Sequence, residues 1–359
     1  MNAILSFLVN LFSVVLVFGI LIISHELGHF WAARRAGVRV ELFTVGFGPK
    51  LFGFQRGGTQ YQVSLIPFGG AVKLAGEENY GRATPKGDEY FAQPAGKRML
   101  ILVMGSVHNL LLGFLAFVLV FLLGVELANY REPVIGGLEP GYPAVQAGLQ
   151  AGDRIIRVAG VPVKDWPSLS GEIHRYPDRE ISLEVDRAGR VFQVRVTPRA
   201  ETLEAGQGSR RIGLVGIGPQ IQREKYGLFA ALGRAGKATA GVVHDIFYYL
   251  GRIFTRKMSG RDLAGPLGIA QLSTRFFRLG WSNFLYFLAL LSVNLAVVNL
   301  FPLPVFDGGH LFGVMLERIS GRKPSPRFIE VGQMIGLGLV LALAVFVTYN
   351  DLLRIIVGR

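Results

Sequence analysis

The sequence has no cysteine among its 359 residues. This absence excludes disulfide bonds, thiolate metal ligands and a cysteine nucleophile. Charged residues are also scarce, at 18% of the chain, whereas a soluble protein of ordinary composition carries about 25%. Hydrophobic residues make up 50% of the chain, and the mean hydropathy is +0.40. A composition this apolar is typical of an integral membrane protein.

Four stretches are long and apolar enough to cross a lipid bilayer, because a hydrocarbon core of about 30 Å needs about 20 helical residues. They comprise residues 1–24, 99–125, 279–306 and 331–350. The first stretch differs from a cleaved signal peptide, since no Lys or Arg precedes it and it is too long for the apolar region of one. The sequence therefore predicts four membrane-spanning helices.

The charges that are present are unbalanced, with 38 Lys and Arg against 25 Asp and Glu. These bases are scattered through loops and are not interleaved with aromatic residues along one element, which argues against a nucleic-acid partner. Basic loops beside apolar spans are expected to contact anionic lipid headgroups. Bases cluster after the first span and between the last two spans, which predicts that both of these loops face the cytosol.

Residues 31–97 contain short alternating runs such as TQYQVSLI, separated by Gly-rich or Gly-Pro turns. This pattern is typical of β-hairpins. The region is apolar for a soluble linker, so we predict β-strands associated with the membrane, where non-helical backbone is tolerated only against protein or a hydrated cavity. A small cytosolic β-subdomain is the alternative.

Residues 133–199 have the composition of a soluble domain, with alternating strand patterns in their second half. The stretch PAVQAGLQAGDRIIRVAGVPV resembles the PDZ family, in which an Ala-Gly-Leu turn, a Gly-Asp pair and a strand follow in this order. PDZ domains bind an extended peptide as an added strand, so the resemblance implies a domain that binds peptide tails. Residues 200–278 form a looser region, within which residues 226–257 predict an amphipathic helix on the membrane surface.

The first apolar stretch is followed directly by HELGH, which places His25, Glu26 and His29 at the end of a membrane span. Two histidines four residues apart lie on one face of a helix and can bind one Zn²⁺, with the glutamate as a general base. An ionisable side chain costs about 2.5–3.5 kcal/mol at the centre of a bilayer, so three of them without an ion carry a large penalty. The sequence therefore predicts a zinc site.

A catalytic zinc ion has three protein ligands and one open position, so HELGH leaves one ligand to be found. The third apolar stretch runs into NLFPLPVFDGGH at residues 299–310, and Asp307 is the only carboxylate in or bordering that stretch. The two prolines break the helix, which is tolerated in a membrane only around a protein-enclosed, hydrated site. Asp307 is therefore the leading candidate for the third ligand, and His310 is the rival.

Several motifs together resemble the site-2 protease family of intramembrane zinc metalloproteases, and the bacterial regulator-of-sigma-E protease type is the closest branch. The motifs are HELGH, GFGP, IPFGG, the PDZ-like stretch, GPLGIA and NLFPLPVFDGG, and they extend over almost the whole chain. The resemblance implies His25, His29 and Asp307 as zinc ligands. It also implies Glu26 as the base and Asn299 as a hydrogen-bonding partner of the extended substrate backbone.

Three features depart from the pattern of that family. Its best-known members carry two PDZ domains, whereas this chain has room for one. Phe306 precedes the ligand aspartate, where the family usually has Leu. The second span begins with Gly-Ser-Val-His-Asn in place of Gly-Pro-x-x-Asn, which retains Asn109 and introduces His108. His108 is either an auxiliary ligand or, as we expect, a histidine satisfied by a neighbouring helix.

The expected fold is an α-helical integral membrane protein with about four transmembrane helices, a membrane-associated β-hairpin loop and one inserted PDZ domain (α+β). The expected segments are residues 1–30 for the first span with the zinc motif, 31–97 for the β-loop, 98–125 for the second span, 133–199 for the PDZ domain, 200–278 for the linker and amphipathic helix, 279–310 for the third span with the aspartate, and 330–356 for the fourth span.

The expected function is zinc-dependent cleavage of single-span membrane proteins in or beside their transmembrane segment. By resemblance, the substrates are anti-sigma factors already trimmed on the outer side, or remnant signal peptides. The expected location is the bacterial cytoplasmic (inner) membrane, with the PDZ domain on the outer side, where it excludes substrates that keep a folded outer domain.

The same residues leave two alternative functions. A catalytically inactive PDZ membrane adaptor is disfavoured by the intact HELGH motif and Asp307. A metal transporter is disfavoured because the four spans lack the several carboxylates and histidines expected along a transport path.

Overall fold

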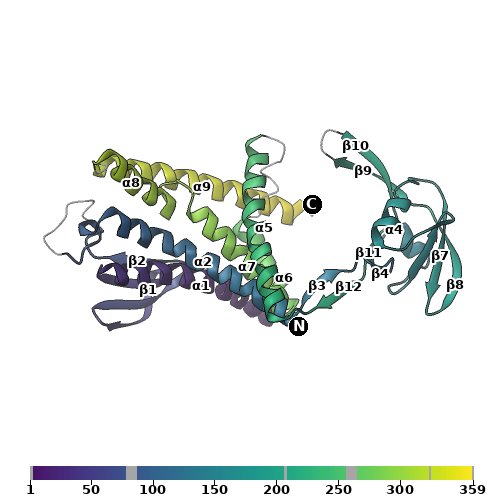
Figure 1. The fold of residues 1–359 in the computed structure, drawn as a ribbon, viewed down its shortest axis with the longest axis horizontal. Helices are drawn as coiled ribbons and strands as arrows, with labels where there is room; N and C mark the ends of the chain where they lie inside the picture. The colour runs from purple at the N-terminus through teal and green to yellow at the C-terminus, as the bar shows by residue number, and fades with distance from the viewer. Residues whose placement is uncertain (1–2, 78–86, 206–207, 256–264, 323–324, 358–359) are drawn as a thin grey trace. The chain divides into compact units, whose positions relative to one another are not determined.

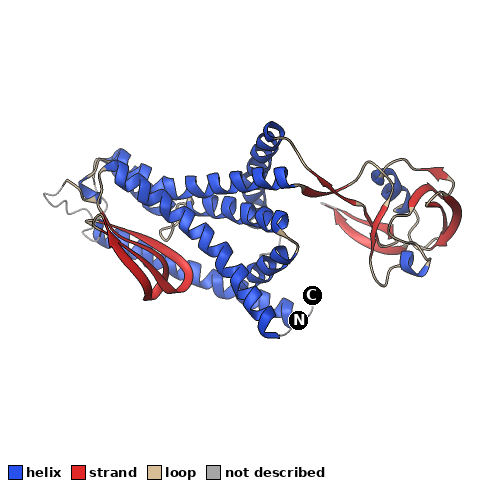
Figure 2. Cartoon of the chain, turned by 90° about the horizontal axis from the view of Figure 1, so that it is seen from below, coloured by secondary structure: helices blue, strands red, loops and turns tan. Residues whose placement is uncertain are grey.

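The computed structural model describes residues 3–77, 87–205, 208–255, 265–322 and 325–357. The chain forms two compact units, one of Met1–Leu123 with Tyr226–Arg359 and one of Gly124–Lys225. The first unit contains the long helices and a β-hairpin, and the second contains short strands with two short helices (Figure 1; Figure 2).

The helices described in the first unit are α1 (Ala3–Ala36), α2 (Ala95–Leu123), α5 (Leu228–Phe254), α6 (Pro266–Arg278), α7 (Trp281–Asn299), α8 (Asp307–Ser320) and α9 (Pro326–Val357). Four of them, α1, α2, α7 and α9, have the length and apolar composition needed to cross a membrane. This confirms the four predicted spans. Only 11% of the apolar stretch of α9 is buried inside the protein, so most of its apolar surface is left for lipid.

Helix α7 ends at Asn299, although the apolar stretch continues to Phe306. The helix ends here because Pro302 has no N–H to donate to the preceding turn and disfavours helical geometry in the residue before it. Turns and bends occupy most of residues 300–306, and α8 begins at Asp307. The segment expected as one span over 279–310 is therefore two helices joined by an irregular connection.

The β-hairpin of the first unit consists of two long strands, β1 (Val40–Arg56) and β2 (Thr59–Leu74). Residues 42–45 of β1 pair with residues 70–73 of β2 on one side and with residues 60–63 on the other. The hairpin therefore curls into four rows, and residues 70–73 form an outer row. A short 3-10 helix (Tyr90–Ala92) follows before α2.

Helix α6, which begins within the GPLGIA motif, is held at both ends by other helices. Asp351 of α9 is 2% exposed and accepts hydrogen bonds from the N–H groups of Gly265 (3.1 Å) and Gly268 (2.9 Å). This carboxylate satisfies N–H groups that a helix start leaves unpaired. Arg278 at the other end donates to Asn10 of α1 at 3.0 Å. Helix α6 thus links α1 to the C-terminal part of α9.

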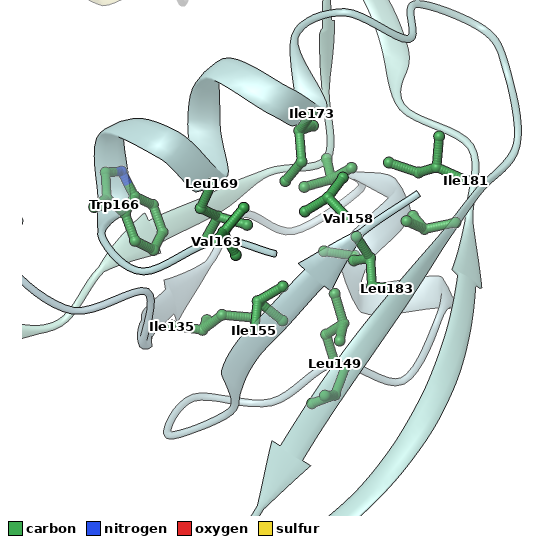
Figure 3. Packing of buried hydrophobic residues seen from close by; sticks show 14 residues of the cluster. Ile135, Leu149, Ile155, Val158, Val163, Trp166, Leu169, Ile173, Ile181 and Leu183 are labelled. Atoms are coloured by element: carbon green, nitrogen blue, oxygen red, sulfur yellow. The ribbon is translucent and has the colours of Figure 1, made fainter. Parts of the chain in front are cut away.

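The second unit has a four-stranded antiparallel sheet in the order β6-β5-β7-β8 and further two-stranded ladders. Figure 3 shows its core, in which Ile155 and Leu183 of the sheet lie beneath Leu169 of α4. The elements are β3 (Val125–Ala128), β4 (Ile135–Leu138), α3 (Pro143–Gln146), β5 (Arg154–Val158), β6 (Val161–Pro162), α4 (Trp166–Ile173), β7 (Ile181–Arg187), β8 (Arg190–Val196), β9 (Arg199–Ala205), β10 (Gly208–Leu214), β11 (Ile217–Pro219) and β12 (Ile221–Glu224).

This unit is longer than the expected 133–199. Strands β9 to β12 lie in residues that we expected to be a linker, and Val215 belongs to the core. β4 pairs with β11 and β3 with β12, which brings the two ends of the unit together. The residue pattern did not indicate these strands, because the stretch GLVGIGP is interrupted by glycine and proline, which are poor strand formers.

A buried ion pair lies beneath one turn of the second unit. The Asp153 carboxylate is 1% exposed and accepts hydrogen bonds from Arg187 at 2.6 and 2.8 Å. Its Oδ2 also accepts from the N–H of Gln150. Burial acts to raise the pKa of Asp153, but these hydrogen bonds outweigh it and hold the pKa below its ordinary value. The carboxylate is therefore fully partnered inside the protein.

Candidate metal centre

Helix α1 carries both histidines of HELGH on one face, as the spacing of four residues predicts. The two rings lie 4.7 Å apart between centroids and almost perpendicular to each other. Their Nε2 atoms are 3.1 Å apart. His29 is 9% exposed, and the side chain of His25 is 12% exposed. The helix therefore presents two imidazole nitrogens to one point.

Asp307 reaches this point from the start of α8. Its Oδ2 atom lies 3.0 Å from Nε2 of His25 and 3.2 Å from Nε2 of His29. The approach requires the two glycines that follow, because a Cβ on Gly308 or Gly309 would lie 2.3 Å from the carbonyl oxygen of Leu300 or Leu303. The structure thus brings together His25, His29 and Asp307, which the sequence predicted as ligands.

The chemistry of these three atoms fits a cation. Nδ1 of His29 is 2.8 Å from the carbonyl oxygen of Ile101, which can only accept, so Nδ1 donates and neutral His29 carries a lone pair on Nε2. Oδ2 of Asp307 is buried and also offers only lone pairs. Zinc at about 2.0 Å from each ligand separates the corners of its tetrahedron by about 3.3 Å. The observed triangle of 3.0–3.2 Å matches that geometry closely.

Helix α2 packs directly against the two imidazoles through Gly105. A Cβ there would lie 2.3 Å from Nε2 of His29 and 2.7 Å from Cε1 of His25. Directly beside this contact, Gly28 of α1 faces the carbonyl of Met104, where a Cβ would lie 2.1 Å from the oxygen. The close approach of α1 and α2 at these glycines sets the position of the rings.

Glu26 is not one of the three grouped ligand residues, and Asn299 lies beside His25. Glu26 is 8% exposed and faces the outer row of the hairpin, where a Cβ on Gly70 would lie 3.0 Å from its Cγ. Asn299 is the last residue of α7, and its Nδ2 lies 3.4 Å from Nε2 of His25. Asn299 therefore stands beside the ligand triangle, and Glu26, which follows His25 in α1, faces the hairpin.

The remaining histidines in this region lie outside the triangle. His310 is exposed on α8. The Nδ1 atom of His108 is 3.0 Å from the Met104 carbonyl, and its ring meets Trp31 of α1 edge-on at 5.2 Å. His108 is thus satisfied by its own helix and packs against a neighbouring one.

Sequence reasoning missed two positions that shape the site. Gly105 was noted only as the first residue of a family-like pattern, although that glycine was the available signal for close helix packing. The Ile101 carbonyl, which orients His29, leaves no trace in residue type, because every residue has a backbone carbonyl.

Comparison with known proteins decides the family. A model of peptidase family M50 matches residues 13–343. The chain belongs to peptidase family M50. This M50 peptidase is 30% identical to the regulator of sigma-E protease RseP of Escherichia coli, over 98% of this chain and 100% of that protein. It is 29% identical to the zinc metalloprotease RasP of Shouchella clausii, over 99% and 100%. A putative zinc metalloprotease of Rhizobium meliloti is 31% identical over 93% of each chain.

These matches agree with the predicted resemblance to site-2 proteases over almost the whole length. The M50 peptidase is therefore a zinc metalloprotease embedded in a membrane. The alignment with the E. coli protein extends over 457 positions, more than the 359 residues of this chain, so that relative carries insertions. The alignment with the R. meliloti protein extends over 352, which indicates a relative of similar size.

Proposed function

We propose that this M50 peptidase cleaves single-span membrane proteins within or beside their transmembrane segment. The observation that carries the proposal is the position of the ligand triangle: two of its three atoms belong to α1, a helix long and apolar enough to cross the membrane. A peptide bond must therefore come to the zinc site from within or beside the bilayer. A substrate with a single span offers such a bond once its helix is locally unwound.

In this proposal, His25, His29 and Asp307 hold the zinc ion, and Glu26 is the general base. Bound Zn²⁺ lowers the pKa of water and polarises a carbonyl group. Glu26 takes a proton from the attacking water and passes it to the leaving amine. Asn299, at the edge of the triangle, donates a hydrogen bond to the substrate backbone and holds it extended. Gly105 and Ile101 keep the imidazoles in place.

The unwound substrate segment, in this proposal, binds along the outer row of the hairpin, residues 70–73. It pairs with β1 on one side, and no described strand pairs with its other side. Gly70 within this row lies against Glu26. An extended substrate segment added to a sheet edge makes main-chain hydrogen bonds regardless of its side chains. Such binding presents the scissile carbonyl beside the base.

The second unit, in this proposal, is a PDZ-like domain that binds extended tails of the substrate. It has a pocket of 430 Å³ between β6 and α4, lined among others by Pro162, Ser168, Gly171 and Ile212. We place the protein in the bacterial cytoplasmic membrane, with this unit outside, because Arg34 and Arg35 follow the zinc motif and further bases lie between α8 and α9. Anti-sigma factors and remnant signal peptides are substrates of the right kind, and the name of the E. coli relative supports the former.

The test uses the full protein in liposomes with a single-span substrate in two forms, one with a folded outer domain and one trimmed to an extended tail. We expect cleavage of the trimmed form, inside or next to its span, that a zinc chelator abolishes. Cleavage confined to soluble regions of the substrate would overturn the proposal.

The same assay tests the second unit. Residues 124–225 can be replaced by a short glycine linker, because Val125 and Glu224 are partners in one β-ladder and the N–H of Tyr226 bonds to the Phe121 carbonyl. We expect the shortened enzyme to cut both forms of the substrate. If it stays active and equally selective, the unit does not sort substrates.

A further inference from the structure

The last turn of α8 is joined to the first turn of α2 by a forked ion pair. Nη1 of Arg98 lies 3.0 Å from Oε2 of Glu317, and Nη2 lies 2.6 Å from Oε1. The Arg98 side chain is 3% exposed, and that of Glu317 is 16% exposed. Two parallel charge-assisted hydrogen bonds fix direction as well as distance. The pair therefore holds the two helices in one relative orientation.

Arg98 is itself held firmly on the α2 side. Its Nε donates to the Gln93 carbonyl at 3.1 Å, in the segment just before α2. Its guanidinium lies 5.8 Å from the centroid of the Phe91 ring. All of these contacts lie at the same helix end. The guanidinium is therefore a fixed point to which Glu317 is attached.

The same side of α2 also controls the histidine ligands. Arg98, Ile101 and Gly105 are spaced by three and four residues, so they fall on one helix face. The Ile101 carbonyl orients His29, and Gly105 packs against both imidazoles. One face of α2 thus touches α1 at the histidines and α8 at Glu317.

Asp307 depends on α8 for its position. It is the first residue of this helix, after an irregular connection, and Glu317 lies ten residues further along, about 15 Å at 1.5 Å per residue. Helix α8 packs chiefly against α2. An α-helix of this length acts as a rigid lever, so a change in the Arg98–Glu317 geometry tilts α8 and moves the carboxylate at its other end.

We propose that Arg98 and Glu317 are positioning residues for the metal site: their forked pair sets where Asp307 meets His25 and His29. The inference rests on the proposed role of Asp307 as a zinc ligand. Helix α2 then serves as a common reference for ligands that come from α1 and α8. Neither Arg98 nor Glu317 belongs to the ligand group of His25, His29 and Asp307.

The test compares Arg98→Lys, which keeps the charge but loses the fork, with Glu317→Gln, which keeps the shape but loses the charge. Arg39→Lys is the control, since its partner Asp88 is 3.0 Å away in a pair with both side chains exposed. Three quantities are measured on the full chain in detergent: zinc affinity against a competing chelator, the visible absorption bands of the Co²⁺-substituted protein, and the melting temperature.

We expect each α2–α8 variant to bind zinc about 10-fold more weakly or worse, as changes to groups behind metal ligands do, and to shift the Co²⁺ bands. The double variant should lose no more zinc affinity than the single variant that binds zinc more weakly, because both substitutions break the same interaction. Arg39→Lys should change neither quantity. Lower melting temperatures with unaltered zinc affinity and Co²⁺ bands would overturn the inference, as would additive losses in the double variant.

Asp307→Ala separates this inference from the proposed function. If Asp307→Ala loses zinc while Arg98→Lys and Glu317→Gln keep wild-type affinity and bands, only the positioning role fails. If Asp307→Ala keeps wild-type zinc affinity, the proposed ligand set fails as well. Should Arg98→Lys not fold, Glu317→Gln carries the same comparison alone.

Discussion

The two units of the chain hold carboxylates in opposite surroundings. In the second unit, Asp153 faces donors on every side: the Arg187 guanidinium and the Gln150 N–H. In the first unit, Asp307 faces two imidazole nitrogens, one of which has its only proton on the far side of the ring. The first arrangement is complete without a further group, and the second is not. A carboxylate that meets an imidazole lone pair has room for a cation, whereas one surrounded by donors is a complete structural tie.

The distinction extends beyond these two residues. Within the described part of the chain, every buried side-chain nitrogen or oxygen without a hydrogen-bond partner belongs to the first unit, including Oδ2 of Asp307, Ser106 Oγ and both amide atoms of Asn109. The described side chains of the second unit contribute none. Unpaired polar atoms are costly inside a protein. Three of these atoms lie on α2 and one on Asp307, and the others belong to Thr239 of α5 and Asn350 of α9.

The largest expected effect comes from replacing each of the two aspartates with alanine and comparing the results. Asp307→Ala should lose both zinc and activity, because two histidines alone leave the ion without its third ligand. Asp153→Ala should keep zinc and destabilise the second unit by about 2 kcal/mol through the lost charged hydrogen bonds. Metal analysis and thermal unfolding of both variants check this. His310→Ala should behave as wild type in both, and the reverse pattern would make His310 the third ligand.

The next effect concerns packing at the ligands. Gly105→Ala places a methyl group where only 2.3 Å separate it from the His29 nitrogen, so the rings must move. We expect zinc affinity to fall about 10-fold or more, as it does when the support of a metal ligand is disturbed. Gly19→Ala is the matched control on α1, because no atom lies within 4 Å of its Cβ. Equal zinc affinity in the two variants would show that the helix contact does not position the rings.

A smaller effect is expected at the edge of the triangle. Asn299→Ala should lower kcat/KM about 10-fold, the equivalent of one hydrogen bond to the substrate, while the zinc content stays full. Steady-state kinetics with the trimmed single-span substrate, together with metal analysis, check this. Unchanged kinetics would remove Asn299 from the substrate site, and a loss of zinc would instead assign it to holding His25.

The smallest effect is the acid sensitivity of the second unit. Because the pKa of Asp153 is lowered in the folded state, its contribution to stability is present above about pH 4, the ordinary pKa of an aspartate, and is lost as the pH falls further. Arg187→Ala should remove that loss and lower stability at neutral pH. Trp166 lies in this unit's core, and the other two tryptophans are exposed, so a Trp31→Phe/Trp281→Phe background reports its unfolding alone. An unchanged acid transition in Arg187→Ala contradicts the assignment.

The membrane spans and the metal site differ in how far the sequence alone predicts them. Four apolar stretches and the four-residue spacing of His25 and His29 are local patterns, and the sequence predicted both correctly. Asp307 was predictable as a candidate because carboxylates beside spans are rare. The contacts that orient the ligands were not. Arg98 and Glu317 are separated by 219 residues, and pairing over such a distance is set by helix packing that no local pattern encodes.

The most direct test of the account is one preparation of Glu26→Gln beside the wild-type enzyme, measured for zinc content and for cleavage of the trimmed single-span substrate. Glu26 follows the ligand candidate His25 in α1 and is not one of the three grouped residues. The account predicts one zinc ion per chain in both proteins and a loss of cleavage in the variant of at least about 100-fold, the low end of what a general base contributes. Cleavage at the wild-type rate, or loss of zinc along with activity, would contradict it.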